Sequence, residues 1–569
     1  MATTERLDGY RFHDHDWDSF AELRDWFEWE VPDQFNMAAY VCDRWAEERP
    51  GDPALFVEDH TAAGEAREDE SGATRTYTFA EFEAEASRLA NHLAAHDVGR
   101  GDRVGVNLPQ KPETAIAHVA AWKLGAVSVP LSTLFGPDGV GYRLADADAD
   151  ACIVDGSNAE ALRRAREDYD VGLASVLVVD GAPEGDERAY ADAVAEQDTG
   201  YEAVETDAED DALLIYTSGT TGDPKGVRHV HRMLLGHLPG VQTNANFGFG
   251  EGSRFWTPAE WAWIASLFDL VFPALYYGRP VLAYHGGEFD PEAAFDLLDR
   301  YDITMTFIPP TALRFMMQVD GERYDVATVE AIGSGGESLG ESVAEWAEET
   351  FSGALVHEGY GQTEANVTVV ENGELAEKRQ GSMGLAAPGH EVTIVDPETA
   401  EETVDPGEVG EIAVRYEGDP VCFIEYWNEP EKTDAKVRDG WLLTEDLGRM
   451  DENGYFYFES RKDDVIISSG YRIGPEEIEE SLASHEAVAD AAVIGVPHDE
   501  RGEVPKAFVV LAVDQQPGDG LREALMAHVK DRLAKYEYPR EVGFVDELPR
   551  TSTGKVRRQR LREREGLAD

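Results

Sequence analysis

The segment at residues 216–227, YTSGTTGDPKGV, combines residue types that suit phosphate binding. Gly219 and Gly222 let the backbone turn so that its N–H groups point toward an anion, and the Thr and Ser hydroxyls can donate hydrogen bonds. Lys225 adds a positive charge. The GxxxxGK[ST] pattern of a Walker A loop is absent, and Pro224 precedes the lysine. With roughly eight constrained positions, the segment predicts a phosphate-binding loop in place of an ordinary polar turn.

The segment at residues 358–364, EGYGQTE, places a carboxylate beside a hydroxyl, at Glu364 and Thr363. Mg²⁺ takes oxygen ligands from one or two carboxylates together with substrate phosphates, and it neutralises charge when pyrophosphate leaves. In a chain with 114 acidic residues, a single acid would ordinarily be a solvated surface group. The metal-binding interpretation therefore depends on further motifs that occur in order along the chain.

Three further segments supply such motifs. Residues 333–338, GSGGES, resemble the start of a dinucleotide fingerprint, but the third glycine is missing, so a dehydrogenase is disfavoured. Asp446, in TEDLGR, offers a carboxylate that can accept two hydroxyl hydrogen bonds. Lys555, in PRTSTGKVRR, follows a Thr-Gly pair suited to insertion into a site. Seven basic residues lie between positions 550 and 564, and pairing with the acidic body is the alternative interpretation for most of them.

In this order, the motifs resemble those of the adenylate-forming superfamily of acyl-CoA synthetases, luciferases and peptide-synthetase adenylation domains, from about residue 35 to 565. The resemblance implies that Thr363 binds the α-phosphate, Glu364 holds Mg²⁺, and Lys555 is the catalytic lysine. By the same resemblance, the ATP-binding residues are Thr217, Ser218, Gly219, Thr220, Thr221, Gly222, Lys225, Gly336, Glu337, Ser338, Glu358, Gly359, Tyr360, Gly361, Gln362, Thr363, Asp446, Arg461, Arg472 and Lys555. Among them, residues 336–338 would line the adenine pocket, and Asp446 and Arg461 would contact the ribose.

The resemblance also implies a second half-reaction with coenzyme A. A hinge would fall at residues 461–463, with its pivot at Asp463, and a few residues suffice to absorb such a backbone change. After rotation, the residues facing coenzyme A would be Ser469, Gly470, Tyr471 and Arg501. The alternatives are an adenylating enzyme with another acceptor and a nucleotide-binding sensor without catalysis. The presence of Lys555, Glu364 and Asp446 together argues against the sensor.

The acyl substrate is predicted from one position and one apolar run. The segments SSGYRIGPEEIE and RGEVPKAFVVLA are most similar to the medium-chain acyl-CoA synthetase branch. Gly361 stands where acetate-specific relatives carry a tryptophan, so the acyl tunnel should extend further, and a Gly361→Trp change should shift preference toward acetate or propionate. Trp261, Trp263 and Leu267 are expected to line this tunnel. We therefore expect a medium-chain, branched or aromatic acid, with a short-chain acetate or propionate ligase as the alternative.

These residues must be held by a large α/β fold. Helical patterns alternate with short apolar runs such as ACIVDG, ALLIYT, MTFIPP and EAIGSGG, which end in residues that open loops at the edge of a mainly parallel sheet. After about residue 390, the spacing indicates an antiparallel β subdomain. We expect a large N-terminal domain of layered sheets at residues 1–460, the hinge at 461–463, and a small mobile α+β domain at 464–569.

Composition excludes several other classes of protein. The net charge is −65, with acids spread along the chain, which disfavours a nucleic-acid partner. Only 11 basic residues are Lys and 38 are Arg, and such a surface suits a halophile's cytoplasm, where salt screens the repulsion. Three isolated cysteines give no disulfide or zinc pattern. The apolar run at residues 261–278 contains Asp269 and Pro273, so we expect buried core and no membrane insertion. The predicted partners are therefore a carboxylic acid, ATP and coenzyme A.

Overall fold

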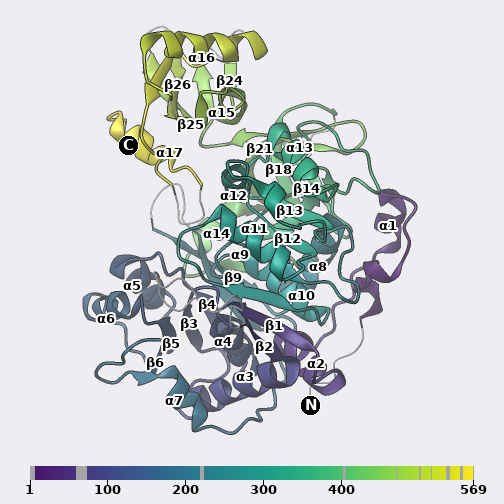
Figure 1. Cartoon of the computed structure of the whole chain (residues 1–569), viewed down its shortest axis with the longest axis vertical. Coiled ribbons are helices and arrows are strands. Elements are labelled where there is room, and N and C mark those ends of the chain that lie inside the picture. Colours follow the sequence, from purple (N-terminus) through teal and green to yellow (C-terminus); the bar gives the residue numbers. More distant parts are fainter. Residues whose placement is uncertain are drawn as a thin grey trace.

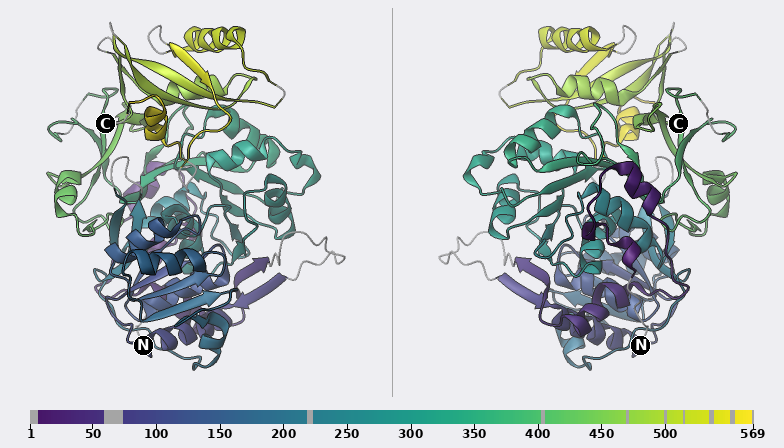
Figure 2. Two further views of the ribbon diagram at one scale, coloured as in Figure 1. Left: turned by 90° about the vertical axis from the view of Figure 1, so that its left-hand side faces the viewer. Right: turned by 90° about the vertical axis from the view of Figure 1, so that its right-hand side faces the viewer.

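The computed structural model describes residues 7–58, 74–217, 223–401, 405–468, 471–498, 501–513, 515–533, 538–550 and 555–567. A large body contains the chain up to about residue 461. A smaller sheet with its own helices lies on one end of this body (Figures 1 and 2). The architecture is α/β with mixed, mainly parallel sheets in the body, as predicted.

The first sheet of the body carries several of the predicted site segments. Its neighbouring strands, in spatial order, are β16 (Leu385–Ala386), β15 (Ala365–Val370), β14 (Leu355–Gln362), β13 (Ala331–Gly335), β12 (Met305–Phe307), β10 (Phe255–Trp256), β11 (Val281–Tyr284), β1 (Pro53–Glu58) and β2 (Thr74–Thr78). The run from β14 to β1 is parallel, and antiparallel strands flank it on both sides. The helices that accompany it are α8 (Met233–Asn244), α9 (Ile264–Ser266), α10 (Phe272–Tyr276), α11 (Pro291–Arg300), α12 (Pro310–Met316) and α13 (Glu341–Thr350).

The second sheet follows the βα rhythm of residues 80–180. Its order is β19 (Glu425–Tyr426), β9 (Lys225–Val230), β8 (Asp211–Thr217), β4 (Val127–Pro130), β3 (Arg103–Asn107), β5 (Ala151–Asp155), β6 (Ser175–Val179) and β7 (Arg188–Ala189). Its helices are α3 (Phe79–Ala94), α4 (Pro112–Lys123), α5 (Pro137–Asp146), α6 (Ala159–Asp168) and α7 (Tyr190–Ala195). Helix α3 begins with a capping box between Thr78 and Glu81, which satisfies two backbone donors that the helix cannot pair itself.

An antiparallel sheet follows along the chain, as the spacing after residue 390 predicts. It consists of β17 (Val392–Val395), β18 (Gly410–Arg415), β21 (Trp441–Met450), β20 (Val437–Arg438) and β22 (Phe456–Arg461), and α14 (Pro430–Lys436) precedes β20. The smaller C-terminal sheet contains β24 (Tyr471–Ile473), β23 (Ile466–Ser468), β26 (Gly502–Leu511), β25 (Val488–His498) and β27 (Glu541–Phe544). Helices α15 (Pro475–Ala483), α16 (Asp519–Arg532) and α17 (Arg558–Arg564) accompany it.

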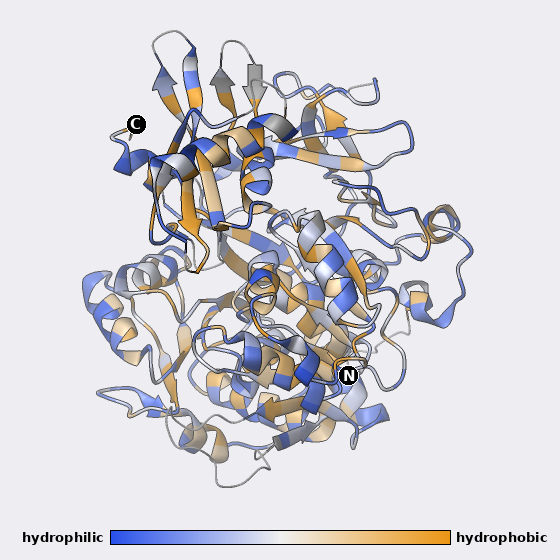
Figure 3. Cartoon of the chain, turned by 45° about the horizontal axis from the view of Figure 1, so that its top comes forward, coloured by the Kyte–Doolittle hydropathy of each residue, from blue (hydrophilic) through white to orange (hydrophobic). Residues whose placement is uncertain are grey.

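The apolar run at residues 261–278 is buried in the body. It forms α9, the π-helix η4 (Leu267–Val271) and α10, and most of its large side chains belong to the main core cluster. Figure 3 shows many apolar residues on the strands and an alternation of apolar and polar residues along the helices. None of the helices in the described ranges is long and apolar enough to cross a membrane.

The charge of the chain predicts a strong dependence of stability on salt. Lowering KCl from 1 M to 0.1 M lengthens the Debye length from about 3 Å to about 10 Å, so repulsion among surface carboxylates should grow. We expect the melting temperature to fall by several degrees over this range. Thermal unfolding followed by circular dichroism checks this, with uncharged sucrose as the control additive. A melting temperature independent of KCl would contradict it.

Candidate active site

The main cavity has a volume of about 760 Å³ and opens at the carboxyl ends of the parallel strands. The residues that follow β10, β11, β12 and β13 line it, together with β14 and the region around α9. Ligands of open α/β sheets bind at this edge because loops of variable sequence meet there. The apolar residues that line it include Val241, Phe249, Phe255, Ile264, Leu270, Met305 and Val367, which all belong to the main core cluster.

Several predicted site residues from separate segments meet in this cavity. Those that line it are Trp263, Gly336, Glu337, Gly359, Gly361, Gln362, Thr363 and Lys555. Lys555 comes from the C-terminal part of the chain, and a Cβ placed on Gly336 would lie 4.0 Å from its Cε. The Glu337 carboxylate accepts hydrogen bonds from the Thr311 hydroxyl at 2.9 Å and from the Arg314 guanidinium at 3.3 Å. A cationic side chain is thus brought to the loop that follows β13.

Two of the residues expected in the acyl tunnel lie elsewhere. Trp261 and Leu267 are not among the described residues that line the cavity, and both are almost fully buried in the core cluster. Trp263 does line it. Leu267 differs because the π-helix η4 widens the turn, so that Asp269 and Leu270 line the cavity while Leu267 packs in the core. Trp261 precedes α9 and η4, and it packs in the same core cluster.

Glu364 lies just beyond β14, 8% exposed, in a setting that keeps its carboxylate ionised. Its Oε1 accepts a hydrogen bond from the Tyr426 hydroxyl. Although burial would raise the pKa of Glu364, the charges of Lys436 and Lys225 and the Tyr426 hydrogen bond hold it below its ordinary value. Lys225 Nζ lies 4.9 Å from the centre of the Tyr426 ring. Mg²⁺ is commonly bound by one or two carboxylates of the protein together with the phosphates of the substrate. The ionised carboxylate of Glu364, next to Thr363, therefore fits that ion.

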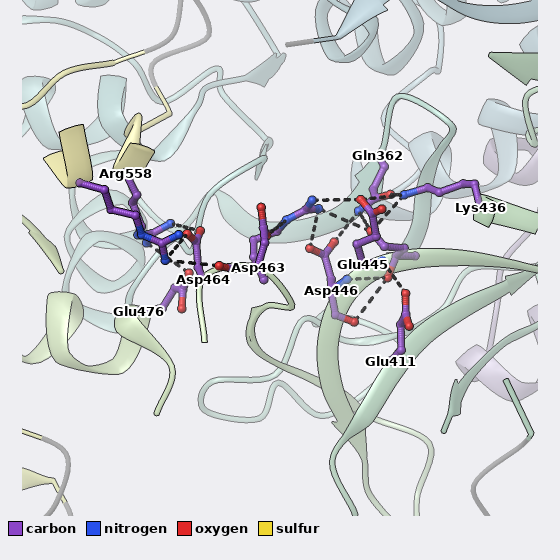
Figure 4. A network of polar contacts seen from close by, with 12 residues as sticks. Gln362, Glu411, Lys436, Glu445, Asp446, Asp463, Asp464, Glu476 and Arg558 are labelled. Carbon is purple, nitrogen blue, oxygen red and sulfur yellow. Dashed lines mark hydrogen bonds and ion pairs between the residues drawn. The ribbon is translucent and has the colours of Figure 1, made fainter. Parts of the chain in front are cut away.

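Asp446 is the centre of a polar network, which Figure 4 shows. The Tyr360 hydroxyl donates to Oδ2 at 2.7 Å, Gln362 Nε2 donates to the same oxygen at 2.6 Å, and Arg461 Nη1 donates to Oδ1 at 3.0 Å. Glu445, which precedes Asp446, has a φ of +63°, a conformation that non-glycine residues rarely adopt. The network thus fixes the Asp446 carboxylate at 4% exposure beside β14.

The same network continues to the predicted hinge. Arg461 Nε lies 3.4 Å from Asp463 Oδ1. The next residue, Asp464, pairs with Arg558 at 3.0 Å, and Arg558 also binds Glu476 and Glu479 at 3.2 and 2.8 Å. Arg558 begins α17, three positions after Lys555. Ion pairs therefore connect the segment of Lys555 to the chain just after Asp463.

The predicted phosphate loop is flanked by a β hairpin. Thr217 ends β8 and lies opposite Lys225, which begins β9. Residues Ser218, Gly219, Thr220, Thr221 and Gly222 lie outside the described residues, as do Ser469 and Gly470. Tyr471 and Arg472 lie on β24, and Arg501 directly precedes β26.

Sequence reasoning missed several residues of the site. Tyr426 and Lys436 act on Glu364 from β19 and α14, and His229 Nε2 lies 2.7 Å from the Thr363 carbonyl oxygen. Burial lowers the pKa of His229 to about 4, so it is neutral at pH 7. No motif marks these residues: the pairing of β9 with its neighbours brings His229 and Tyr426 to the site, and Lys436 comes from the end of α14.

Ser338 and Glu358, which were predicted to bind ATP, are not among the described residues that line the cavity. The Ser338 carbonyl accepts from Arg314, and Glu358 is turned toward Glu371 and the backbone of Leu339. Burial, together with the charges of Glu371 and Glu480, raises the pKa of Glu358 to about 8. Alternation along β14 turns Glu358 away from the cavity, whereas the next residue, Gly359, lines it.

The raised pKa of Glu358 predicts a pH-dependent effect of the Glu358→Gln change. The folded-state pKa of about 8 exceeds the ordinary value of 4.5, so the wild type loses stability as pH rises from about 4.5 through 8. Because glutamine does not titrate, the variant should gain in melting temperature relative to wild type across this window. The exposed Glu391→Gln change is the control. A difference in melting temperature that is the same at pH 6 and pH 9 would contradict the assignment.

Gly361 lines the cavity, as an open acyl tunnel would require, but close packing of the backbone also excludes a side chain at this position. A Cβ at this position would meet the Val367 nitrogen at 2.3 Å and the Asn366 Cα at 2.7 Å, both backbone atoms of β15. The idea that Gly361→Trp would simply shorten the tunnel is thereby revised. We expect Gly361→Ala to destabilise the fold by about 1–3 kcal/mol, as overpacking does, and Gly361→Trp to lose rate on all acids, acetate included. Urea denaturation and acid profiles check this. Wild-type stability with a clean shift to acetate would contradict it.

Comparisons with known proteins show which family and which relatives the chain resembles. A model of the AMP-binding enzyme family matches residues 42–426, and one of the AMP-binding enzyme C-terminal domain matches residues 477–555. The chain is 36% identical over 518 residues to the uncharacterized acyl-CoA ligase YtcI of Bacillus subtilis, covering 90% of this chain and 95% of that protein. It is 33% identical over 560 residues to mouse mitochondrial acyl-coenzyme A synthetase ACSM3, covering 96% and 93%. The crystal structure of the anthranilate CoA ligase AuaEII with anthranoyl-AMP superposes with a TM-score of 0.85, at 27% identity, covering 94% and 98%.

Proposed function

The chain belongs to the AMP-binding enzyme family, and from this premise we propose that it is an AMP-forming acyl-CoA synthetase. It would convert a carboxylic acid, ATP and coenzyme A to acyl-CoA, AMP and diphosphate through an acyl-AMP intermediate. The observation that carries the proposal is the meeting of Lys555 with Thr363 and the Gly336 loop in one cavity.

The first half-reaction must bring a carboxylate to the α-phosphate of ATP. Two like charges 4 Å apart repel by about 4 kcal/mol at an effective dielectric of 20. Lys555 and Lys225 supply compensating charge in our proposal, with Lys555 bridging the carboxylate and the α-phosphate. The carboxylate oxygen attacks phosphorus in line, diphosphate leaves, and catalysis rests on positioning and electrostatics.

Recognition of the nucleotide is proposed for the neighbouring polar groups. Asp446, held by Tyr360, Gln362 and Arg461, is suited to accept hydrogen bonds from the ribose hydroxyls. Gly336 and Glu337 would border the adenine. When Mg²⁺ is bound, Glu364 would hold it, and the ion would neutralise charge on the leaving diphosphate.

The second half-reaction is proposed to use a different orientation of the smaller sheet. Rotation about Asp463 would withdraw Lys555 and present β24 and the segment of Arg501 to the acyl-AMP, where the coenzyme A thiolate attacks the acyl carbon and AMP leaves. The ion pairs of Arg558 with Asp464 and Glu479 support rotation as a unit, because they join the Lys555 segment to the rest of that sheet.

We propose a medium-chain, branched or aromatic acid as the substrate. The apolar residues that line the cavity, among them Phe249, Phe255 and Met305, support an acyl group larger than acetate. Release of AMP should be measured across acids from acetate to octanoate and benzoate, with and without coenzyme A, at 1 M KCl. A preference for acetate or propionate would favour the short-chain alternative, and sustained AMP release without coenzyme A would favour another acceptor.

A further inference from the structure

The wall of the cavity contains a carboxylic acid and an amide that the proposed reaction does not use. Asp269 and Asn366 both line the cavity, alongside Leu270 and Val367. We infer that this pair forms a subsite for a hydroxyl group, so that the preferred acid carries a hydroxyl on its chain or ring. The inference rests on the proposed function, because it names the substrate class of the same cavity.

The two side chains bind each other. Asn366 Nδ2 donates to Asp269 Oδ1 at 2.7 Å and to Oδ2 at 2.9 Å. No further side-chain hydrogen bond or ion pair of either residue is found within the described ranges. Asp269 lies deep in the protein yet keeps part of its surface accessible, and that part faces the cavity. Hydrogen-bonding capacity of both groups is therefore left for a ligand.

Asp269 is placed on the cavity wall by an unusual turn of helix. It is the central residue of the π-helix η4, between Leu267 and Val271, which are buried in the core. Single π-helical turns within helices occur frequently at functional sites, because the extra residue redirects side chains. An apolar residue at this position would pack in the cavity wall without any desolvation cost, so packing alone does not account for a carboxyl group here.

Asn366 is held in place by a tightly packed backbone. The following residue, Val367, has a φ of +53°, which is strained for a β-branched side chain. Two glycines surround this strand: a Cβ on Gly361 would meet the Asn366 and Val367 backbone at 2.3 to 2.8 Å, and one on Gly240 would meet the Val367 carbonyl oxygen at 2.2 Å. Such over-determined strain is characteristic of positions that orient a functional group.

The chemistry of the pair favours a neutral ligand group. Burial raises the pKa of Asp269 well above its ordinary value, and one amide donor offsets little of that effect. A protonated carboxyl offers one O–H donor and an acceptor oxygen, and the Asn366 carbonyl oxygen is a second acceptor. A hydroxyl both accepts and donates one hydrogen bond, so it can satisfy this pair. A methylene at the same place would leave buried polar groups without partners.

The test compares matched acids on the intact enzyme. Each unsubstituted acid is paired with its monohydroxy and monoamino derivatives, and kcat/KM for acid-dependent diphosphate release is measured at saturating ATP. For the best pair, we expect wild type to prefer the hydroxy acid by about 100-fold, because sites built to bind a hydroxyl reject analogues that lack it. Asp269→Leu and Asn366→Leu should each lose this preference and favour the unsubstituted acid. Asp290→Asn, which keeps the cap of α11 while removing a carboxylate from the cavity mouth, should retain it.

The wild-type profile decides the inference even if a variant does not fold. Activation of unsubstituted acids with no gain from any hydroxyl position overturns the inference and leaves the proposed function standing. Preference for the monoamino derivative of the acid also overturns the inference, because Asp269 would then act as an ionised partner of the ammonium group. Failure of every acid to support diphosphate release overturns the proposed function and the inference together.

Discussion

Replacement of Lys555 with alanine is expected to lower the rate of acyl-AMP formation by about 100- to 1000-fold, the loss that follows removal of one positioned donor from a reacting centre. Lys555 lines the cavity beside Gly336, and it comes from a part of the chain that the proposed rotation would withdraw. The variant should therefore still convert supplied acyl-AMP and coenzyme A to thioester at the wild-type rate. Single-turnover assays of the two half-reactions measure both rates separately.

The control for this change is Arg560→Ala. Arg560 lies in the same basic segment, is exposed, and pairs locally with Glu563. If the segment served only to pair with the acidic body, the two variants would show similar, small effects. Equal loss of both half-reactions in Lys555→Ala would contradict the assignment, because the lysine would then act on the acyl-AMP in either orientation.

Glu364→Gln is expected to raise the Mg²⁺ concentration that gives half-maximal adenylation by at least about 10-fold, with a lower maximal rate. The carboxylate of Glu364 is buried, and Lys436 and Lys225 hold it ionised. Because glutamine has nearly the same size as glutamate, the change removes the charge and leaves the volume of the side chain. Titrations of diphosphate release against Mg²⁺ measure the effect, and they should be repeated with Mn²⁺.

Glu425→Gln provides a matched control, since Glu425 precedes Tyr426 on β19 and pairs on the surface with Arg228. It should leave the Mg²⁺ dependence unchanged. An unaltered Mg²⁺ requirement in Glu364→Gln would show that the ion is held by the phosphates alone, and the metal-binding role of Glu364 would be withdrawn.

Sequence reasoning predicted the strands and the edge at which the cavity opens. Apolar runs such as MTFIPP and EAIGSGG mark β12 and β13, because buried parallel strands need unbroken apolar sequence and end where polar loops begin. Ordered motifs elsewhere also indicated Thr363, just after β14, and Lys555, before α17, and the structure brings both to one cavity.

Side-chain direction was the part that sequence patterns could not supply. Leu267 packs in the core because η4 departs from the regular helical period, and Glu358 turns away because strands alternate. Trp261, which precedes α9, also packs in the core. Tyr426 and Lys436 reach Glu364 through strand pairing and helix placement far along the chain, which no local motif records.

Transfer of ¹⁸O from the carboxylic acid tests the central claim most directly. In an acyl-AMP pathway, the attacking carboxylate oxygen becomes bonded to the α-phosphorus and stays there when coenzyme A displaces AMP. With doubly ¹⁸O-labelled acid, ATP and coenzyme A, mass spectrometry should find one ¹⁸O in AMP and the other in the acyl-CoA. Label in inorganic phosphate together with ADP, or AMP without label, would contradict the proposal.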